Sequence, residues 1–374
     1  MRLIDIETPF LVLDRGRLAA NASFMAGRAA RLGVRLRPHV KTIKSVDALR
    51  YALPAVDAIT VSTLREAEYF AGAGYRDILY AVGLAPGKIA HVAKLRAQHV
   101  DLHVVVDTVE AAQALASAEA PPSGFSAYIE IDTGGGRGGV LPDDAQLLNV
   151  AHALTRSNAI ELRGVLTHAG QSYRCRTIDD VKMIAEAERA GAVFAAGRLR
   201  GQGFACPEVS VGSTPTAIHA ASLDGATEMR PGVFFLMDVF QQQVGACGAG
   251  DLALSVVASV IGVRPNENIV LVDAGALALS QDRSTAGQDG ADWGFGRVGG
   301  VDGGPWPGAK VSAVHQEHGF VHCPDAQLLA RLRPGSRVRI WPNHACMTAA
   351  GHEHYTVVEG NDAVVATWPR VNHW

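Results

Sequence analysis

Apolar residues in the first two thirds of the chain fall into short runs separated by longer amphipathic stretches. The short runs are rich in Val, Ile and Leu, as strands are, and the stretches between them are rich in Ala, Arg and Glu, as helices are. Strand and helix alternate at about 25 to 40 residues per unit, which is typical of parallel strands joined by helical crossovers. The expected strands cover residues 11–13, 35–37, 58–61, 78–81, 102–106, 128–131, 164–167 and 208–211. The expected helices cover residues 17–32, 63–72, 85–98, 109–118, 142–157 and 178–202.

Beyond residue 245 the pattern changes to β-rich runs with few helical stretches, which predicts a mostly antiparallel second domain. Residues 281–308, rich in glycine, are expected to form a long loop. We predict an α/β plus β protein with an N-terminal (β/α)8 (TIM-type) barrel at residues 8–245 and a C-terminal mainly antiparallel β domain at residues 246–374, with residues 1–7 packing against that domain. An open doubly wound sheet produces the same local pattern, and periodicity alone does not exclude it.

Composition narrows the classes of protein and of partner. The 374 residues are 48% hydrophobic and 19% charged, with a net charge of -3, so neither a disordered chain nor a nucleic-acid-binding surface is indicated. No apolar run is long enough for a membrane span, and the first residues lack the apolar centre of a secretory signal. Five cysteines without framework spacing indicate reduced thiols. We expect a cytoplasmic enzyme without a membrane or nucleic-acid partner.

Lys41 follows an expected barrel strand and precedes an expected helix. A lysine at the C-terminal end of a barrel strand points into the active site, where its amine can form a Schiff base or act as a base. An isolated lysine is more often a solvated surface residue. Lys41 therefore needs support from the rest of the chain.

Polar residues also follow three later strands. Arg137 lies in a glycine-rich segment after strand 128–131, and His168 and Tyr173 follow strand 164–167. Each of these is as compatible with a structural role as with a functional one. Strand 208–211 is followed by a turn suited to phosphate, because glycine lets backbone amides approach an anion and hydroxyls donate hydrogen bonds. The expected phosphate-binding residues are Gly212, Ser213 and Thr214, together with Gly232 and Val233 late in the barrel.

His344 and Cys346 are the candidate metal ligands. They are two residues apart, and on an extended segment such residues face the same side, so imidazole and thiolate can bind one ion. As an isolated pair they are more often structural. Two protein ligands would leave positions open for water or substrate, as a catalytic ion requires.

Two segments carry a resemblance to a known family. Residues 8–14 (Thr-Pro-Phe-Leu-Val-Leu-Asp) and residues 38–42 (Pro-His-Val-Lys-Thr) resemble the alanine racemase-like, fold-type III class of pyridoxal 5'-phosphate (PLP) enzymes. The likeness is to its metal-dependent branch of D-serine dehydratases, D-threo-3-hydroxyaspartate dehydratases and D-threonine aldolases, and it extends along nearly the whole chain.

The resemblance implies a role for each candidate. Lys41 would hold PLP and act as the base, and Arg137 would orient the cofactor ring or its 3-hydroxyl. Tyr173 would stack near the cofactor or position the substrate, His168 would join it in the active site, and the two phosphate-binding segments would match those of the family. His344 and Cys346 would bind the metal. The class also implies a homodimer.

The implied reaction is PLP- and Zn²⁺-dependent β-elimination of a D-3-hydroxy amino acid, such as D-serine or D-threo-3-hydroxyaspartate, to a keto acid and ammonia. The alternative is a D-threonine aldolase, which gives glycine and an aldehyde. Cys346 favours the dehydratase because a thiolate suits Zn²⁺, whereas the aldolases resemble this segment with an aspartate, which suits Mn²⁺ or Mg²⁺.

Two further alternatives depend on the second domain. A racemase would need an opposing acid or base there, and Tyr355 is the only tyrosine in that domain. A non-catalytic PLP-binding protein of the same class would lack the domain altogether. Residues 246–374 and their candidate metal pair argue against that alternative.

Overall fold

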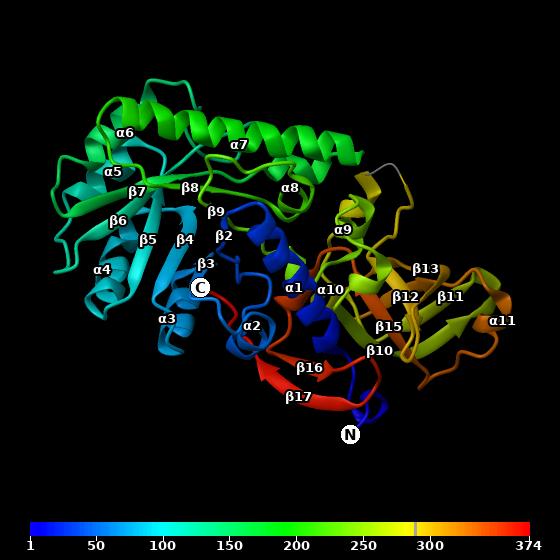
Figure 1. Ribbon diagram of the computed structural model, residues 1–374. Coiled ribbons are helices and arrows are strands. Elements are labelled where there is room, and N and C mark those ends of the chain that lie inside the picture. Colours follow the sequence, from blue (N-terminus) through cyan, green and yellow to red (C-terminus); the bar gives the residue numbers. More distant parts are fainter. Residues whose placement is uncertain (288–289) are drawn as a thin grey trace. The chain divides into compact units, whose positions relative to one another are not determined.

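The computed structural model describes residues 1–287 and 290–374, which divide into two compact units (Figure 1). The barrel unit comprises Phe24–Lys41, Ala55–Gly232 and His373–Trp374. The second unit comprises Met1–Ser23, Thr42–Pro54 and Val233–Asn372. Each unit is therefore assembled from segments that are distant in the sequence. None of the helices in the described ranges is long and apolar enough to cross a membrane.

Eight parallel strands form the sheet of the barrel unit, in the order β2-β9-β8-β7-β6-β5-β4-β3. The ring closes because residues just beyond β2 pair with β3: His39 bridges Thr60, and the Val40 N–H donates to the Thr60 carbonyl at 2.9 Å. This closure confirms the predicted barrel over the open sheet. The strands are β2 (Arg35–Leu36), β3 (Ala58–Val61), β4 (Asp77–Gly83), β5 (Asp101–Val106), β6 (Phe125–Glu130), β7 (Ile160–Leu166), β8 (Glu208–Val211) and β9 (Glu228–Met229).

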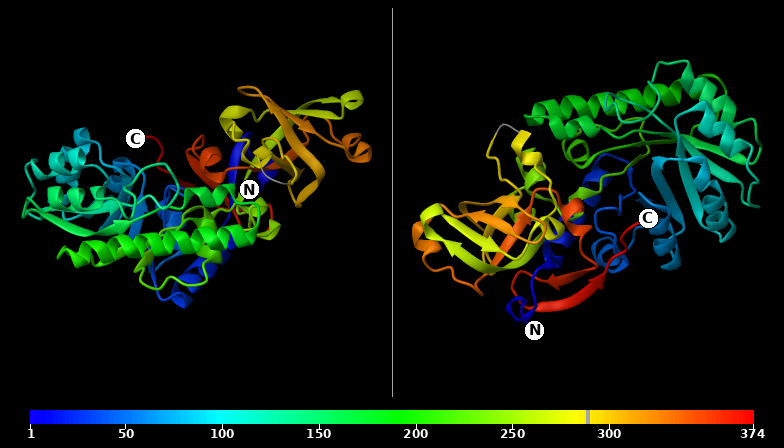
Figure 2. Two further views of the ribbon diagram at one scale, coloured as in Figure 1. Left: turned by 90° about the horizontal axis from the view of Figure 1, so that it is seen from above. Right: turned by 180° about the vertical axis from the view of Figure 1, so that it is seen from behind.

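Helices cover the outside of the barrel, and the long helix α7 can be followed in all three views (Figures 1 and 2). Their starts are encoded locally: the hydroxyl of Thr63 accepts from the Glu66 N–H at the start of α3, and Thr177 forms a capping box with Asp180 at the start of α7. The helices are α3 (Leu64–Gly72), α4 (Ile89–Ala97), α5 (Val109–Ala116), α6 (Gln146–Leu154), α7 (Ile178–Gly201) and α8 (Thr214–His219), with the 3₁₀ turns η2 (Pro86–Lys88) and η3 (Gly170–Arg174).

Buried charges close the N-terminal end of the barrel. Arg37, with a fully buried side chain, donates through Nε to Glu228 Oε2 at 2.8 Å and also pairs with Asp77. Asp77 and Glu228 are the first residues of β4 and β9. A guanidinium with partners on both sides is stable inside the barrel, whereas a single buried charge would be costly. This end of the barrel is therefore structural, and the opposite end carries the candidate site.

The second unit contains a nine-stranded sheet in the order β11-β14-β13-β12-β15-β10-β1-β16-β17. Strand β10 also pairs with β11, so the strands from β11 to β10 form a closed ring, and all pairs except β1–β16 are antiparallel. The predicted antiparallel C-terminal β domain is confirmed. The strands are β1 (Phe10–Asp14), β10 (Leu254–Arg264), β11 (Ile269–Val272), β12 (Gly296–Gly300), β13 (Pro305–Val314), β14 (Gly319–His322), β15 (Arg337–Pro342), β16 (His354–Val358) and β17 (Val364–Pro369).

Short helices complete this unit: α2 (Val46–Ala52), α9 (Val239–Gln243), α10 (Ala276–Leu279), α11 (Ala326–Leu329) and α12 (Ala345–Ala349). Helix α1 (Arg15–Arg31) begins in the second unit and ends in the barrel unit. The 3₁₀ turns are η1 (Leu3–Asp5), η4 (Val233–Phe235), η5 (Ala249–Asp251), η6 (Pro265–Glu267) and η7 (Ser284–Gly287).

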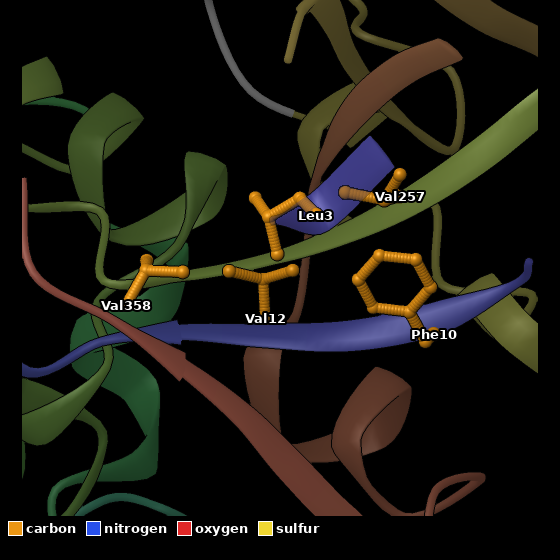
Figure 3. Close-up of a cluster of buried hydrophobic side chains, with 5 residues drawn as sticks. All are labelled: Leu3, Phe10, Val12, Val257 and Val358. Atoms are coloured by element: carbon orange, nitrogen blue, oxygen red, sulfur yellow. The ribbon is translucent and has the colours of Figure 1, made fainter. Parts of the chain in front are cut away.

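Strand β1 corrects the prediction that residues 11–13 form a barrel strand. It lies between β10 and β16, where Phe10 and Val12 pack with Leu3, Val257 and Val358 (Figure 3). The eighth barrel strand is instead β9, whose two residues are too few to show a period. Within the predicted barrel range, residues 8–245, the segments 8–23, 42–54 and 233–245 belong to the second compact unit.

The predicted loop at 281–308 is also more ordered than expected. It contains η7, the whole of β12 and the start of β13. Its glycines approach backbone closely, as where a Cβ on Gly299 would lie 2.3 Å from the Gly304 carbonyl oxygen. Glycine is therefore needed here because the paired strands leave no room for a side chain. Residues 288–289 of this segment lie outside the described residues.

Candidate active site

A cavity of about 360 Å³ opens among the segments that follow the barrel strands. Most of its polar lining comes from the C-terminal ends of different strands, which is where barrel enzymes hold their catalytic groups. Charged groups of both signs face it. Its charged and imidazole residues are His39, Lys41, Asp107, Glu130, Arg137, His168 and Arg230.

Lys41 lies in the cavity wall, as predicted from its position after β2. Its side chain is half-buried, and its backbone N–H faces His39 Nδ1 at 3.5 Å. Burial, followed by the charges of Lys41 and Arg230, keeps the pKa of His39 well below its ordinary value. The imidazole is therefore neutral at pH 7, and Lys41 has a neutral neighbour.

His168 lines the same cavity, and its ring is hydrogen-bonded to the Gly212 backbone. Burial, with the nearby charges of Lys41 and Arg137, lowers the pKa of His168 to about 3. Such a ring remains neutral at pH 7 and is a poor proton donor. Tyr173 lies beside it in η3, with ring centroids 6.2 Å apart, and is absent from the cavity wall as far as the described residues define it.

Arg230 is a cavity residue that sequence reasoning missed. Its side chain is buried, and its Nε donates to Ser210 Oγ at 2.6 Å while Nη2 donates to the Thr167 carbonyl. Ser210 Oγ in turn donates to Glu228 Oε1 at 2.7 Å. Burial lowers the pKa of Arg230, and the surrounding carboxylates offset only part of this effect. Its place directly before the candidate phosphate segment Pro231-Gly232 was the available signal.

Arg137 reaches the cavity from a glycine-rich loop. One oxygen of Asp132 accepts backbone N–H groups of Gly134, Gly135 and Gly136 at 2.9, 2.8 and 3.1 Å, which gives the loop a defined shape. The Arg137 side chain is 64% exposed, and its Nη2 lies 3.8 Å from Glu130 Oε1. Arg137 therefore has room to rearrange towards a ligand.

The predicted phosphate turn follows β8 and begins α8. Gly212 has φ +111°, a conformation that glycine adopts without strain, and a Cβ there would lie 3.3 Å from the Arg230 backbone nitrogen. The Ser213 N–H donates to Thr216 Oγ1 at 2.9 Å, and the Thr216 N–H donates to Ser213 Oγ at 3.3 Å. The turn adjoins the cavity through His168 and Arg230. Thr214 follows it in α8, Gly232 ends the barrel segment, and Val233 begins η4 in the second unit.

The candidate metal pair lies in the second unit, between β15 and α12. His344 has extended backbone angles but Cys346 is already helical, so the expectation that one extended segment presents both was wrong. His344 Nδ1 is 3.1 Å from Asp282 Oδ2, and Cys346 Sγ is 3.3 Å from the hydroxyl oxygen of Thr42. Within residues 1–287 and 290–374, no group of three or more His, Cys, Asp or Glu residues is arranged to hold a metal.

The groups around His344 and Cys346 favour a bound cation. Burial of the His344 ring works against protonation, but hydrogen bonds to Asp282 and Cys346 outweigh it and raise the pKa of His344 to about 11. Burial raises the pKa of Asp282, and its hydrogen bonds to His344 and Ser284 lower it to about 2. Because imidazole and sulfur already share a hydrogen bond, a metal ion could take the place of the shared proton.

Tyr355 is unsuited to the role that a racemase would require. Its side chain is fully buried, and its hydroxyl donates to the Ile43 carbonyl at 2.8 Å. Burial raises its pKa. The hydroxyl is thus committed to the backbone and poorly placed to exchange protons with a substrate.

Comparisons with known proteins match both parts of the chain. Residues 13–238 match the family model of the alanine racemase N-terminal domain, and residues 253–358 match that of a putative serine dehydratase domain. The chain is 44% identical to D-threo-3-hydroxyaspartate dehydratase of Delftia sp. (strain HT23), over 100% of this chain and 99% of that one. It is 29% identical to D-serine dehydratase of Dictyostelium discoideum over 99% and 98% of the two chains. It is 30% identical to D-threonine aldolase of an Arthrobacter species over 97% and 91%.

The solved structure of the Delftia dehydratase superimposes with a TM-score of 0.94 over 100% of both chains. A cysteine-to-alanine variant of a D-threo-3-hydroxyaspartate dehydratase, described as the metal-free form, superimposes with a TM-score of 0.95 at 43% identity, over 100% of both chains. The similarity thus covers both units of the present chain.

Proposed function

The chain belongs to the alanine racemase N-terminal domain family and continues into a putative serine dehydratase domain, and on this premise we propose that it is a PLP- and Zn²⁺-dependent lyase of D-3-hydroxy amino acids. The proposed reaction is β-elimination of D-threo-3-hydroxyaspartate or D-serine to a keto acid and ammonia. The Delftia dehydratase, at 44% identity over the whole chain, supports this choice of reaction.

The barrel cavity fits the cofactor. Lys41 supplies an amine in the wall and Arg230 supplies a buried cation. The turn beginning at Gly212 lies against Arg230, where a Cβ on Gly212 would be 3.3 Å from the Arg230 backbone nitrogen. We propose that the turn of Gly212, Ser213 and Thr214 surrounds the phosphate, together with Gly232 and Val233. Gly212 contributes the close approach of its backbone, because Glu188 accepts its N–H. Bound PLP supplies an electron sink for the charge that develops at the substrate α-carbon.

Lys41 is the proposed base for the α-proton, because it is the amine that lines the cavity in the described part of the chain. His39 and His168 stay neutral at pH 7 and so add no positive charge to repel the ammonium that Lys41 becomes. His168 acts by orienting the Gly212 backbone. Arg137, in the loop after β6, and Tyr173, in η3 after β7, are proposed to contact the ring of the cofactor or the substrate.

His344 and Cys346 are the proposed zinc ligands. Asp282 occupies Nδ1 of His344, which leaves Nε2 for the metal, and a carboxylate on the other ring nitrogen is the usual partner of a metal-binding histidine. Zn²⁺ is a Lewis acid that lowers the cost of a departing hydroxide. Thiolate and imidazole together suit zinc better than Mg²⁺ or Mn²⁺.

The observation that carries the proposal is the coexistence of a cavity lysine after β2 with a histidine–cysteine pair in the second unit. A PLP-binding protein without turnover would need only the first feature. An aldolase remains the second candidate, supported by the Arthrobacter relative, and Cys346 is the residue that disfavours it. The expected homodimer and cytoplasmic location stay predictions.

The test is a product assay on protein loaded with PLP and Zn²⁺. D-threo-3-hydroxyaspartate, D-serine and D-threonine are offered, and keto acid with ammonia is quantified against glycine with aldehyde. We expect keto acid and ammonia, lost on chelation and restored by Zn²⁺. Cys346→Ala should retain the visible absorbance of bound PLP and lose elimination, whereas Cys175→Ala, at a half-buried free cysteine, should retain both.

Glycine and aldehyde as the main products would replace the dehydratase by the aldolase. Full elimination activity in metal-free Cys346→Ala protein would remove the metal from the reaction. Absence of PLP absorbance in the parent protein, with Lys41 intact, would overturn the proposal as a whole.

A further inference from the structure

Glu188 is a buried carboxylate that the proposed reaction does not use. It lies in the middle of α7 on the face that packs on the barrel, where its neighbours one helical turn away are Ala185 and Ala192, and its exposed fraction is 2%. Burying a carboxylate in such a stripe is costly unless hydrogen bonds replace its water. A leucine or alanine would serve packing better, so the acid at this position calls for another explanation.

Three hydrogen bonds converge on this carboxylate from two different turns. Glu188 Oε1 accepts the Ala169 N–H at 2.8 Å and the Gly212 N–H at 3.0 Å. Glu188 Oε2 accepts from the Thr216 hydroxyl at 2.8 Å. Ala169 follows β7, whereas Gly212 and Thr216 bracket the proposed phosphate turn after β8. Glu188 therefore joins the segment that carries His168 to the turn that would hold the phosphate.

The backbone of Gly212 is held by two side chains. Glu188 accepts its N–H, and the ring of His168 is hydrogen-bonded to the backbone of the same residue. A second link between the two turns lies close by, because Ser172 Oγ and Ser213 Oγ are 2.9 Å apart. With Gly212 at φ +111°, the direction of the following amides depends on how this residue is held.

We propose that Glu188 is a positioning residue for the phosphate group of the cofactor. Because Glu188 accepts hydrogen bonds from the Gly212 N–H and the Thr216 hydroxyl, it fixes the orientation of the turn between these two residues. The proposal rests on the proposed function, because it assumes that the turn from Gly212 to Thr214 receives a phosphate. Glu188 is not among the residues that line the cavity in the described ranges, so it would act on the cofactor through the backbone that it holds.

A stability role would act differently. If Glu188 only tied α7 to the barrel, its loss would weaken all ligands of the cavity to the same extent. If it positions the phosphate turn, its loss should weaken PLP and leave pyridoxal, which has the same ring and aldehyde without the phosphate, nearly unchanged.

The experiment compares the dissociation constants of PLP and pyridoxal for apoprotein, followed by absorbance and fluorescence. We expect Glu188→Ala to reduce the preference for PLP over pyridoxal by at least about tenfold, which corresponds to the loss of a well-placed hydrogen-bonding group. Glu188→Gln should fall between the parent and Glu188→Ala, because its amide oxygen can still accept both N–H groups but its amide nitrogen cannot accept from the Thr216 hydroxyl.

Two controls lie on the same helix. Glu186→Ala removes an exposed carboxylate that pairs with Arg189, and Ala195→Gly weakens the helix at a buried position further along α7. Both should keep the preference for PLP. If Glu188→Ala does not fold, an unchanged preference in Glu188→Gln overturns the proposal and a reduced one supports it.

The outcomes separate this proposal from the proposed function. A parent protein that binds PLP and pyridoxal equally has no phosphate site, and both proposals fall. A parent that prefers PLP, with the same preference in Glu188→Ala, overturns the role of Glu188 alone. Equal weakening of both ligands in Glu188→Ala also overturns it.

Discussion

Thr42 follows Lys41 directly in the chain, and its side chain is fully buried. Its hydroxyl oxygen lies 3.3 Å from Cys346 Sγ, a distance suited to an O–H···S hydrogen bond. A metal-bound thiolate accepts such a bond more strongly than a neutral thiol does. One hydroxyl thus connects the residue after the proposed PLP lysine to a proposed zinc ligand.

We predict that Thr42→Val weakens Zn²⁺ binding by roughly tenfold, because valine has the shape of threonine and lacks the donor to sulfur. Thr42→Ser retains the hydroxyl and should stay within about threefold of the parent protein. Competition titrations against a chromophoric chelator measure both constants. Equal Zn²⁺ affinity in the two variants would show that the hydroxyl is irrelevant to the metal.

Whether a site residue could be identified from the sequence depended on its position relative to the predicted strands. Lys41, Arg137 and His168 were singled out because each lies in the segment that follows a strand, and all three line the cavity. Arg230 and Glu188 were missed because a charged residue is normally assigned to a solvated face. Their partners, Thr167 and Gly212 among them, are far away in the sequence, so only the folded chain shows that these charges are satisfied.

At the scale of elements, β1 has the largest effect on how the chain is divided. It is a fully buried strand, antiparallel to β10 and parallel to β16, in the middle of the sheet of the second unit. Local periodicity correctly predicted a strand at residues 11–13, but pairing partners more than two hundred residues away leave no local trace. The short β9 escaped prediction for the opposite reason, because closure of the ring, not its own sequence, makes it a strand.

We therefore predict that a fragment of residues 246–374 does not fold, because removal of β1 exposes the edges of β10 and β16 together. A fragment that carries residues 1–23 on a flexible linker should recover at least part of the sheet. Circular dichroism and thermal unfolding compare the two, with Val12→Asp in the longer fragment as control, since a buried charge at this fully buried position should abolish the recovery. Cooperative unfolding of the shorter fragment alone would contradict the prediction.

At the scale of the whole molecule, buried neutral histidines make stability depend on pH. The pKa of His168 is about 3 in the folded protein, with burial as the main cause, against an ordinary value of 6.5. Between these values the unfolded chain binds one more proton than the folded chain, so the free energy of unfolding falls as the pH falls. His39, whose pKa is also lowered by burial, acts in the same direction.

From pH 7 to pH 5, His168 alone should reduce the free energy of unfolding by about 2 kcal/mol, since each pH unit below the unfolded pKa contributes about 1.4 kcal/mol. His168→Asn cannot titrate, and its loss of stability over this interval should be smaller than that of the parent protein by that amount. His99→Asn is the matched control, because His99 is exposed at φ 60°, a conformation that asparagine tolerates. Urea unfolding of apoprotein at both pH values gives the differences.

The raised pKa values of Glu188 and Glu130 act in the opposite direction but are common to all three proteins, so the difference between variants isolates the histidine. If the parent and His168→Asn lost stability equally, the pKa of His168 would be the same in the folded and the unfolded protein. The imidazole beside Lys41 would then not be held neutral by the fold.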